Sequence, residues 1–266
     1  MSDKNSSFYL IKEYVKYYFK SNNAHGVHSP FVFKLYNDVV KDRTPFYCFE
    51  AIELLRKELE LNYEKITVED YGAGSRKPTG QTKTISEIAR SSLTRPKYAQ
   101  LLFRLINWSG SRNLLELGTS LGITTSYLAS VNPNSKVFSF EGDWAIAQTA
   151  RNNFDKLGLK NINLQTGPFE EALSPWLASI DFKLDFVFLD GNHRYNSTLE
   201  YFDRILPHLH EKSIVVLDDI RWSNGMEKVW NELRNRKEIS VSIDLFQMGV
   251  LFFKQDQEKQ NFLIRY

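Results

Sequence analysis

The sequence predicts an α/β protein with a Rossmann-like, doubly wound sheet. From Asn113 onward, short apolar runs alternate with helix-compatible segments, and strands that are apolar throughout are typical of a parallel sheet covered on both faces. The runs at 240–246 and 249–254 are separated by only two residues, which is too short for a helical crossover. We therefore expect seven strands, five of them parallel and the last two forming a C-terminal antiparallel hairpin.

The elements of the sheet-bearing part follow one another in a regular order. The five parallel strands are expected at 113–117, 136–141, 162–166, 184–190 and 213–219. The helices between and after them are expected at 123–131, 144–157, 169–178, 197–209 and 226–236. Gly158 stands where a glycine commonly ends a helix. This rhythm predicts one domain over residues 101–266.

Residues 1–100 differ from the rest, being rich in aromatic side chains and lacking the strand and helix alternation. They predict a mainly helical N-terminal extension, with helices at 8–20, 31–40, 52–61 and 84–92, and another at 99–108. Between them, residues 67–83 predict an ordered basic loop. A long loop inside a compact protein is commonly functional, so we expect the extension and this loop to act as a lid over a ligand.

Composition excludes several classes of function. The net charge of +2 in 266 residues favours neither nucleic acid nor an anionic membrane as a partner. The single cysteine, Cys48, excludes an internal disulfide and a multi-cysteine zinc site. No apolar run approaches the roughly 20 residues that span a bilayer, and the N-terminus lacks the apolar core of a signal peptide. We expect a cytoplasmic protein, with its oligomeric state open and a homodimer as one alternative.

The most informative motif is LLELGTSLG at 114–122. A strand, two glycines at G-x-x-x-G spacing and a helix start make a turn whose backbone N–H groups a ligand can approach. A dinucleotide-binding turn needs a further glycine where this chain has Ser120. Glu116, just before Gly118, suits a cationic or hydroxyl-bearing ligand better than a phosphate. The turn therefore favours S-adenosylmethionine over NAD or ATP.

An acidic residue, Glu141, closes the second predicted strand. An acid at that place in a nucleotide-binding α/β unit accepts hydrogen bonds from ribose hydroxyls. The alternative is an acid that interacts with the start of the next helix, a role for which Asp143 is the better candidate. We favour the ribose role for Glu141.

Three aspartates, Asp190, Asp218 and Asp219, follow the fourth and fifth strands, at the edge where open α/β sheets bind ligands. Converging carboxylates repel one another unless a cation or a shared proton relieves them. Oxygen ligands suit Mg²⁺ or another divalent cation such as Ca²⁺, which would lower the pKa of an attacking hydroxyl. The alternative is that only Asp190 touches the ligand, while Asp219 caps the next turn.

Histidine side chains form the last group of candidates. His193, three residues after Asp190, is a candidate general base, the alternative being a loop histidine without a catalytic role. His25 and His28 lie on a glycine-containing turn and favour structural hydrogen bonds over metal binding, with a pocket-lining role as the alternative. The segment Asp70–Arg76 contains two glycines but no helix follows it, so a basic loop is favoured over a nucleotide-binding turn.

Together these motifs resemble the class I S-adenosylmethionine-dependent methyltransferases, and among them the group around catechol and caffeoyl-CoA O-methyltransferases. The resemblance covers roughly residues 100–255 and the N-terminal segment is similar to that of methyltransferase-like proteins from Bacteroidetes. It implies cofactor contacts from the glycine-rich turn, the ribose-binding acid and the segment after the third strand. Those residues are Glu116, Gly118, Thr119, Ser120, Gly122, Glu141, Gly142, Gly167 and Phe169, together with Asp190.

The same resemblance implies catalytic and metal-binding roles for the later motifs. VFLDGNHRY is similar to the metal-aspartate segment of the family, with His193 where the catechol enzymes have a lysine base. VVLDDI is similar to the Asp-Asn metal pair, with Asp219 in place of the asparagine. His193 and Asp190 are the catalytic candidates, while Asp190, Asp218 and Asp219 are the candidate metal ligands.

The sequence thus predicts transfer of a methyl group from S-adenosylmethionine to a hydroxyl of a small acceptor, with or without a divalent cation. One alternative is a module that binds S-adenosylmethionine without catalysis, and another is a Rossmann oxidoreductase. A third is an N-methyltransferase acting on a macromolecule. The chain has neither an N-P-P-Y-type tetrapeptide after the fourth strand nor a strongly basic composition, so the third is disfavoured.

Overall fold

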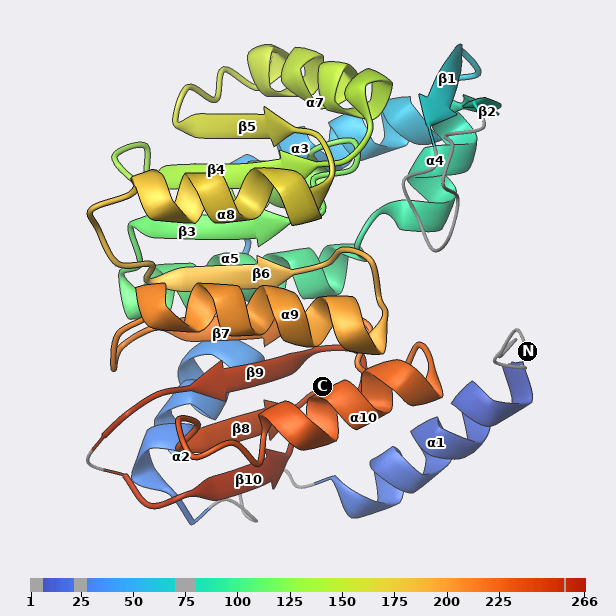
Figure 1. Ribbon diagram of the computed structural model, residues 1–266. Coiled ribbons are helices and arrows are strands. Elements are labelled where there is room, and N and C mark those ends of the chain that lie inside the picture. Colours follow the sequence, from blue (N-terminus) through green and yellow to red (C-terminus); the bar gives the residue numbers. More distant parts are fainter. Residues whose placement is uncertain (1–6, 22–27, 70–79, 256) are drawn as a thin grey trace. The chain divides into compact units, whose positions relative to one another are not determined.

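The structure is a computed structural model that describes residues 7–21, 28–69, 80–255 and 257–266. The chain divides into two compact units, one of Met1–Arg43 with Lys183–Tyr266 and one of Thr44–Phe182. Figure 1 labels the elements of both. We call them the outer-segment unit and the central unit, and describe each by itself. The domain boundary predicted between residues 100 and 101 stays a prediction.

The strands of the central unit are β3 (Asn113–Leu117), β4 (Lys136–Glu141) and β5 (Ile162–Thr166), in the order β3-β4-β5. All three have the predicted bounds and pair in parallel, so their carboxyl ends meet at one edge. In this register Glu116 is the partner of Ser139, and Glu141 is the partner of Thr166. Two acids singled out in the sequence are thereby placed at that edge.

Helices lie on both sides of these strands (Figure 1). Trp176 packs its ring 5.0 Å from that of Phe138 and 5.4 Å from that of Phe140, between centroids. A separate buried cluster includes Phe49 and Phe103. The helices are α3 (Tyr47–Glu60), α4 (Ile85–Ser92), α5 (Pro96–Ser109), α6 (Ile123–Ser130), α7 (Trp144–Lys156) and α8 (Phe169–Ser179). This arrangement confirms the doubly wound α/β class.

The segment predicted as a loop at 67–83 begins and ends in strands. β1 (Lys65–Glu69) and β2 (Gly80–Thr84) pair antiparallel. Sequence analysis missed this hairpin because β2 is polar and mostly exposed, so it shows no apolar pattern. The helix α4 follows at once, and a capping box between Thr84 and Glu87 fixes where it starts. Residues Asp70–Arg76 lie outside the described residues.

The strands of the outer-segment unit are β6 (Phe186–Leu189), β7 (Ile214–Leu217), β8 (Val241–Asp244), β9 (Gly249–Phe252) and β10 (Gln260–Leu263), in the order β10-β8-β9-β7-β6. β6 and β7 are parallel, and β9 is antiparallel to β7 and β8, which confirms the predicted hairpin. β10 pairs in parallel with β8 and was not predicted. Its sequence, QNFL, is partly exposed and has no apolar run that would have indicated a strand.

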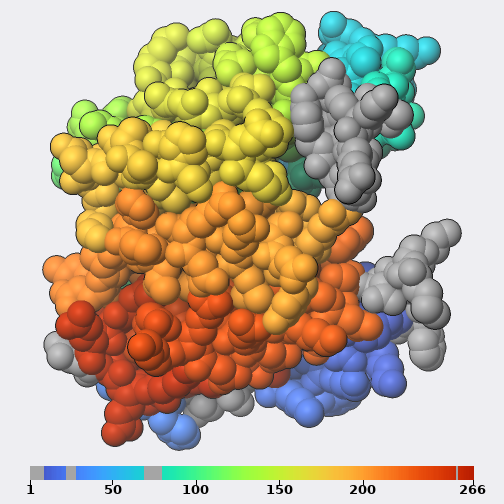
Figure 2. Space-filling view, in the orientation of Figure 1, coloured from blue at the N-terminus to red at the C-terminus, as the bar shows by residue number. Residues whose placement is uncertain are grey.

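The helices of this unit are α1 (Ser7–Lys20), α2 (Pro30–Leu35), α9 (Tyr195–Ile205) and α10 (Asn224–Leu233), with short π and 3₁₀ turns at Tyr36–Val40 and Leu206–His208. In Figure 2 the side chains of the orange segment that contains α9 form a continuous surface on the side shown. Ser223 starts α10 by accepting a hydrogen bond from the Met226 N–H. Among the described helices, none is long and apolar enough to cross a membrane.

Candidate active site

The turn after β3 depends on glycine at two positions. Gly118 and Gly122 have φ angles of 104° and 81°, in the region that favours glycine. A Cβ on Gly122 would lie 2.5 Å from the Phe154 ring, which is far too close for any side chain. The N–H groups of Gly118 and Thr119 both donate to the Phe140 carbonyl, at 3.0 and 3.1 Å. The predicted turn is therefore present and is tied to the neighbouring strand.

Three contacts hold the middle of this turn. The Ser120 N–H donates to Glu141 Oε2 at 2.8 Å, and Asn153 Nδ2 donates to the Leu121 carbonyl at 2.9 Å. The hydroxyls of Ser120 and Ser92 lie 2.8 Å apart. Ser120 has a positive φ of 49°, which costs a non-glycine residue of order 1 kcal/mol or more. The surroundings compensate for that strain and hold the turn in one conformation.

Sequence analysis missed Ser92 and Asn153. Asn153 is 2% exposed on α7, so a buried polar side chain inside a helix was the signal available for it. Ser92 gave no such signal, because it is exposed at the end of α4. Thr119 differs from the expectation in one respect. Its side chain is 1% exposed and bonds the Ser139 hydroxyl at 2.5 Å, so only its backbone lies on the turn surface.

Glu116 lies beneath the turn and is completely buried. Its Oε2 accepts from the hydroxyls of Thr125 and Ser139, at 2.5 and 2.6 Å. Its Oε1 is buried without a hydrogen-bond partner. Burial raises the pKa of this carboxyl to about 7. A buried acid with one unpaired oxygen is set up to accept a proton or a cationic group.

Glu141 lies at the carboxyl end of β4, beside the turn. Its Oε2 accepts from Ser120 and its Oε1 accepts from the Asp143 N–H at 3.1 Å. Burial raises its pKa, and these N–H bonds oppose that rise. Asp143 is the N-cap of α7, accepting from the Ile146 N–H at 2.7 Å, so the helix-capping role belongs to Asp143 as expected. Each Glu141 oxygen keeps capacity for a further hydrogen bond.

The segment after β5 meets the same edge of the central unit. Gly167 has a φ of 132°, and its N–H donates to the Glu141 carbonyl at 2.9 Å. Phe169 begins α8 two residues later and is partly exposed, as is Gly142. The structure therefore gathers the turn, Glu141 and Gly167, which are candidates from three different strand ends.

A second group of candidates lies in the outer-segment unit, after β6 and β7. His193 Nε2 is 3.7 Å from Asp190 Oδ1. Burial lowers the pKa of His193, and the charge of Asp219 opposes this. The lowered pKa favours the neutral imidazole, which is able to accept a proton. Asn192 has a positive φ of 62°, so this loop is also held in an unusual backbone conformation.

The aspartate pair after β7 is buried on one side only. Asp218 is 3% exposed, and its Oδ1 accepts from the Asp219 N–H at 2.8 Å and from Gln247 Nε2 at 3.3 Å. Burial raises the pKa of Asp218 to about 8, and the charge of Asp219 adds to the rise. Asp218 also shares a side-chain hydrogen bond with Asp190. The structure thus brings Asp190, His193, Asp218 and Asp219 together.

These aspartates do not fit a divalent cation well. Within residues 7–21, 28–69, 80–255 and 257–266, no group of three or more His, Cys, Asp or Glu side chains is arranged to hold a metal ion. The predicted cation stays a prediction, and we derive no chemical step through it.

Three sequence candidates remain. His28 is exposed. His25 and the Asp70–Arg76 segment lie outside the described residues. Their expected roles stay predictions.

Comparison with known proteins supports the same fold. Residues 115–220 match a family described as "Methyltransferase domain". The chain is 29% identical over 126 residues to a catechol O-methyltransferase from Niastella koreensis, covering 47% of this chain and 55% of that one. It is 25% identical over 130 residues to the O-methyltransferase imqG of Aspergillus flavus, covering 47% and 52%. The chain thus spans about half the length of these curated relatives.

A solved structure extends the likeness in fold. The O-methyltransferase from Bacillus cereus, crystallised with S-adenosylhomocysteine, has a TM-score of 0.57 at 17% identity, covering 84% of this chain and 97% of that one. Residues 115–220 are thus similar to a methyltransferase domain, and the fold is similar to that of a solved O-methyltransferase. The chain's matched relatives named here are O-methyltransferases, as the sequence motifs predicted.

Proposed function

We propose that this protein transfers a methyl group from S-adenosylmethionine to a hydroxyl of a small acceptor. One observation carries the proposal: the Gly118–Gly122 turn lies beside Glu141 and above the unpaired Glu116 Oε1. This set of groups is complementary to a ligand that has ribose hydroxyls and an ammonium group. The matches to O-methyltransferases support the same reading.

In this proposal the central unit binds the cofactor. Glu141 accepts the ribose hydroxyls with the acceptor capacity left after its two N–H bonds. The turn residues Gly118, Ser120 and Gly122 contact the methionine part, with Glu116 nearest its ammonium group. The adenine ring lies by the segment after β5. The groups assigned there are Gly142, Gly167 and Phe169, with Thr119 contributing backbone only.

The sequence motifs assign the acid and base groups of this proposal to His193 and Asp190. Neutral His193 accepts the proton of the acceptor hydroxyl, and the oxygen attacks the methyl carbon in line with the sulfur. The new C–O bond forms as the C–S bond breaks, and S-adenosylhomocysteine leaves with both electrons of that bond. Asp190, 3.7 Å from His193, stabilises the imidazolium that results. The sulfonium of the bound cofactor supplies the activated methyl group.

The acceptor in this proposal is a small hydroxylated molecule. The net charge of +2 offers no strong attraction to nucleic acid, and the catechol O-methyltransferase among the relatives suggests catechols as the first acceptors to try. A divalent cation is left out because no group of three or more His, Cys, Asp or Glu side chains in the part of the chain that the structure describes is arranged to hold one. We therefore expect activity to survive exhaustive treatment with EDTA, measured with and without added Mg²⁺.

Two measurements test the proposal. Isothermal titration should detect binding of S-adenosylmethionine and S-adenosylhomocysteine, while NAD should not bind. A methyl-transfer assay on a panel of catechols should then detect turnover. Binding without turnover on every acceptor would favour a non-catalytic module, and binding of NAD without S-adenosylhomocysteine would overturn the assignment.

A further inference from the structure

The turn that carries Asp218 and Asp219 is attached to the turn between β8 and β9. The Ile220 N–H donates to the Gln247 carbonyl at 3.0 Å, and the Gln247 side chain donates to Asp218 Oδ1 at 3.3 Å. Asp219 has a positive φ of 52° and Phe246 one of 73°. Both turns are therefore held in unusual backbone conformations, and each supports the other through these bonds.

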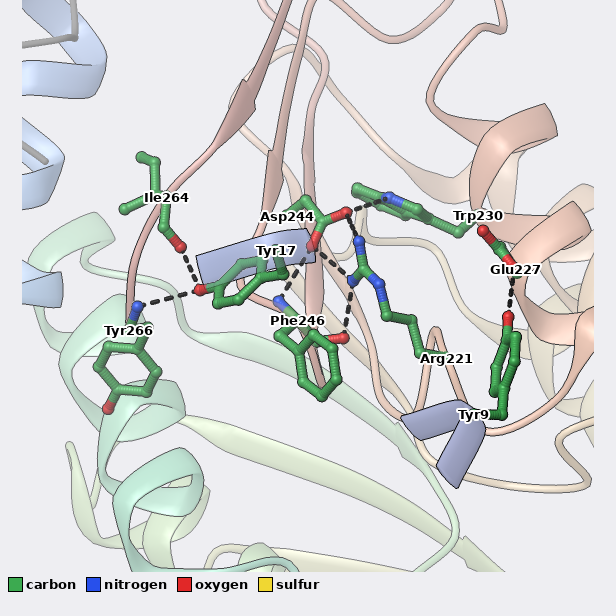
Figure 3. A network of polar contacts seen from close by, with 9 residues as sticks. All are labelled: Tyr9, Tyr17, Arg221, Glu227, Trp230, Asp244, Phe246, Ile264 and Tyr266. Carbon is green, nitrogen blue, oxygen red and sulfur yellow. Dashed lines mark hydrogen bonds and ion pairs between the residues drawn. The ribbon is translucent and has the colours of Figure 1, made fainter. Parts of the chain in front are cut away.

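Arg221 joins the two turns through a planar, bidentate ion pair (Figure 3). Its Nη1 and Nη2 each donate to an oxygen of Asp244 at 2.7 Å, and Nη1 also donates to the Phe246 carbonyl at 2.9 Å. The side chains of Arg221 and Asp244 are only 15% and 4% exposed. A fork of this kind fixes orientation as well as distance, which a lysine cannot reproduce.

Asp244 in turn accepts from two further groups. The Phe246 N–H donates to its Oδ1 at 2.9 Å, and Trp230 Nε1 donates to its Oδ2 at 3.2 Å. The carboxylate is therefore saturated by four donors, and it has one orientation. Because Arg221 is bonded to both oxygens of that carboxylate, the orientation of its guanidinium group is fixed as well.

The N-terminal helix α1 covers the guanidinium group. The Arg221 Cζ atom lies 5.8 Å from the centre of the Tyr17 ring and 5.1 Å from that of Phe246. The Tyr17 hydroxyl donates to the Ile264 carbonyl at 2.5 Å and accepts from the Tyr266 N–H at 3.0 Å. Tyr9, at the other end of α1, donates to Glu227 at 2.7 Å. Figure 3 shows Tyr17, Phe246 and the ion pair of Arg221 with Asp244 side by side, and these contacts shield the pair from much of the solvent.

We infer that Arg221 is a positioning residue for the Asp218–Asp219 turn, and that α1 completes the enclosure around it. It is not assigned contact with substrate, because α1 and the β8–β9 turn cover it. The expected effect of Arg221 on turnover rests on the proposed function. If the inference is correct, α1 helps to hold the Asp218–Asp219 turn in place by covering Arg221.

The test compares Arg221→Lys with Arg236→Lys. Arg236 is a matched control, since it pairs with Asp203 and lies 5.3 Å from the Phe202 ring, but has no bond to the Asp218 turn. In Arg221→Lys we expect hydrogen exchange of the Ile220 and Phe246 amides to speed up more than tenfold. Methyl-transfer kcat should fall about tenfold or more, while the Kd for S-adenosylmethionine changes less than twofold. Arg236→Lys should leave all three unchanged.

A milder variant, Gln247→Ala, removes only the side-chain bond to Asp218 and keeps the ion pair. It should lower kcat severalfold without changing exchange at Phe246. The inference is overturned if Arg221→Lys leaves exchange at residues 219–222 unchanged, or if kcat and cofactor binding decline together with the melting temperature. If the wild type shows no turnover on any catechol, the proposed function fails, whereas the exchange comparison still decides whether Arg221 holds the turn.

Discussion

The two groups of candidate residues are built in different ways. The turn of the central unit is held by partners at moderate separations along the chain, 21 residues for Glu141 with Ser120 and 32 for Asn153 with Leu121. The acid-bearing turn of the outer-segment unit has one partner at a similar separation, Gln247, which is 29 residues from Asp218. It also depends on the N-terminal helix, because the cover over Arg221 comes from Tyr17, which bonds Ile264 at a separation of 247 residues.

This difference implies that a substitution in one group of residues should leave the property that depends on the other group unchanged. Substitutions in the central unit should change cofactor affinity, because they alter the surface that binds it. Substitutions in the outer-segment unit should change turnover, because they alter the base or its placement. Four experiments test or sharpen this separation.

The largest effect is expected for His193→Ala. Loss of a general base typically lowers turnover by roughly 10²- to 10⁴-fold. The Kd for S-adenosylmethionine should stay within about twofold in isothermal titration, since the assigned cofactor contacts lie mainly in the central unit. Asp190→Asn is the companion variant and should reduce kcat less. Unchanged kcat in His193→Ala would remove the base from the proposed mechanism.

Glu141→Ala should have the converse effect. Hydrogen bonds to a charged group contribute about 1.5–3 kcal/mol each, so loss of two to the ribose weakens cofactor binding roughly 10²-fold or more. Glu171→Ala, an exposed acid in the first turn of α8, is the control and should leave the Kd unchanged. The ribose role is wrong if the Glu141→Ala protein binds S-adenosylhomocysteine as tightly as the wild type.

Gly122→Ala tests how far the cofactor turn depends on glycine. A positive φ costs an alanine about 1–2 kcal/mol, and the overlap with Phe154 adds about 1–3 kcal/mol. Gly110→Ala is a matched control, because Gly110 has a φ of 69° but no atom lies within 4 Å of the position that an alanine Cβ would take. Urea unfolding should show a clearly larger loss for Gly122→Ala. Equal losses would mean that Phe154 moves aside without cost.

The smallest effect concerns Glu116 and pH. Its pKa is raised from an ordinary 4.5 to about 7, so the folded state keeps a proton that the unfolded state loses between these values. That stabilisation is complete below about pH 4.5 and is lost as pH rises through about 7. Glu116→Gln should remove this dependence, a difference of roughly 3 kcal/mol in unfolding free energy across the range. Parallel pH profiles for both proteins would contradict the raised pKa.

Much of the central unit could be predicted from the sequence. β3, β4 and β5 have the predicted bounds because each is a short run bounded by turn residues, and Gly158 ends α7 with a φ of 68° as expected. Strands β2 and β10 were missed, since they are polar or partly exposed and have no apolar periodicity, and without β2 the short β1 had no predicted partner. The spacing of apolar residues along a sequence indicates which side chains are buried, so it cannot reveal a strand whose side chains are mostly exposed.

The sequence by itself determined the class of fold and the Gly118–Gly122 turn, because glycine spacing and the alternation of apolar runs act through local backbone geometry. Only the tertiary structure decided the surroundings of the aspartates, with Asp218 buried and accepting a hydrogen bond from Gln247. It also decided that Arg221 is enclosed by Tyr17 and Phe246. Burial and long-range pairing set those properties, and neither is encoded in the spacing of residues along the chain.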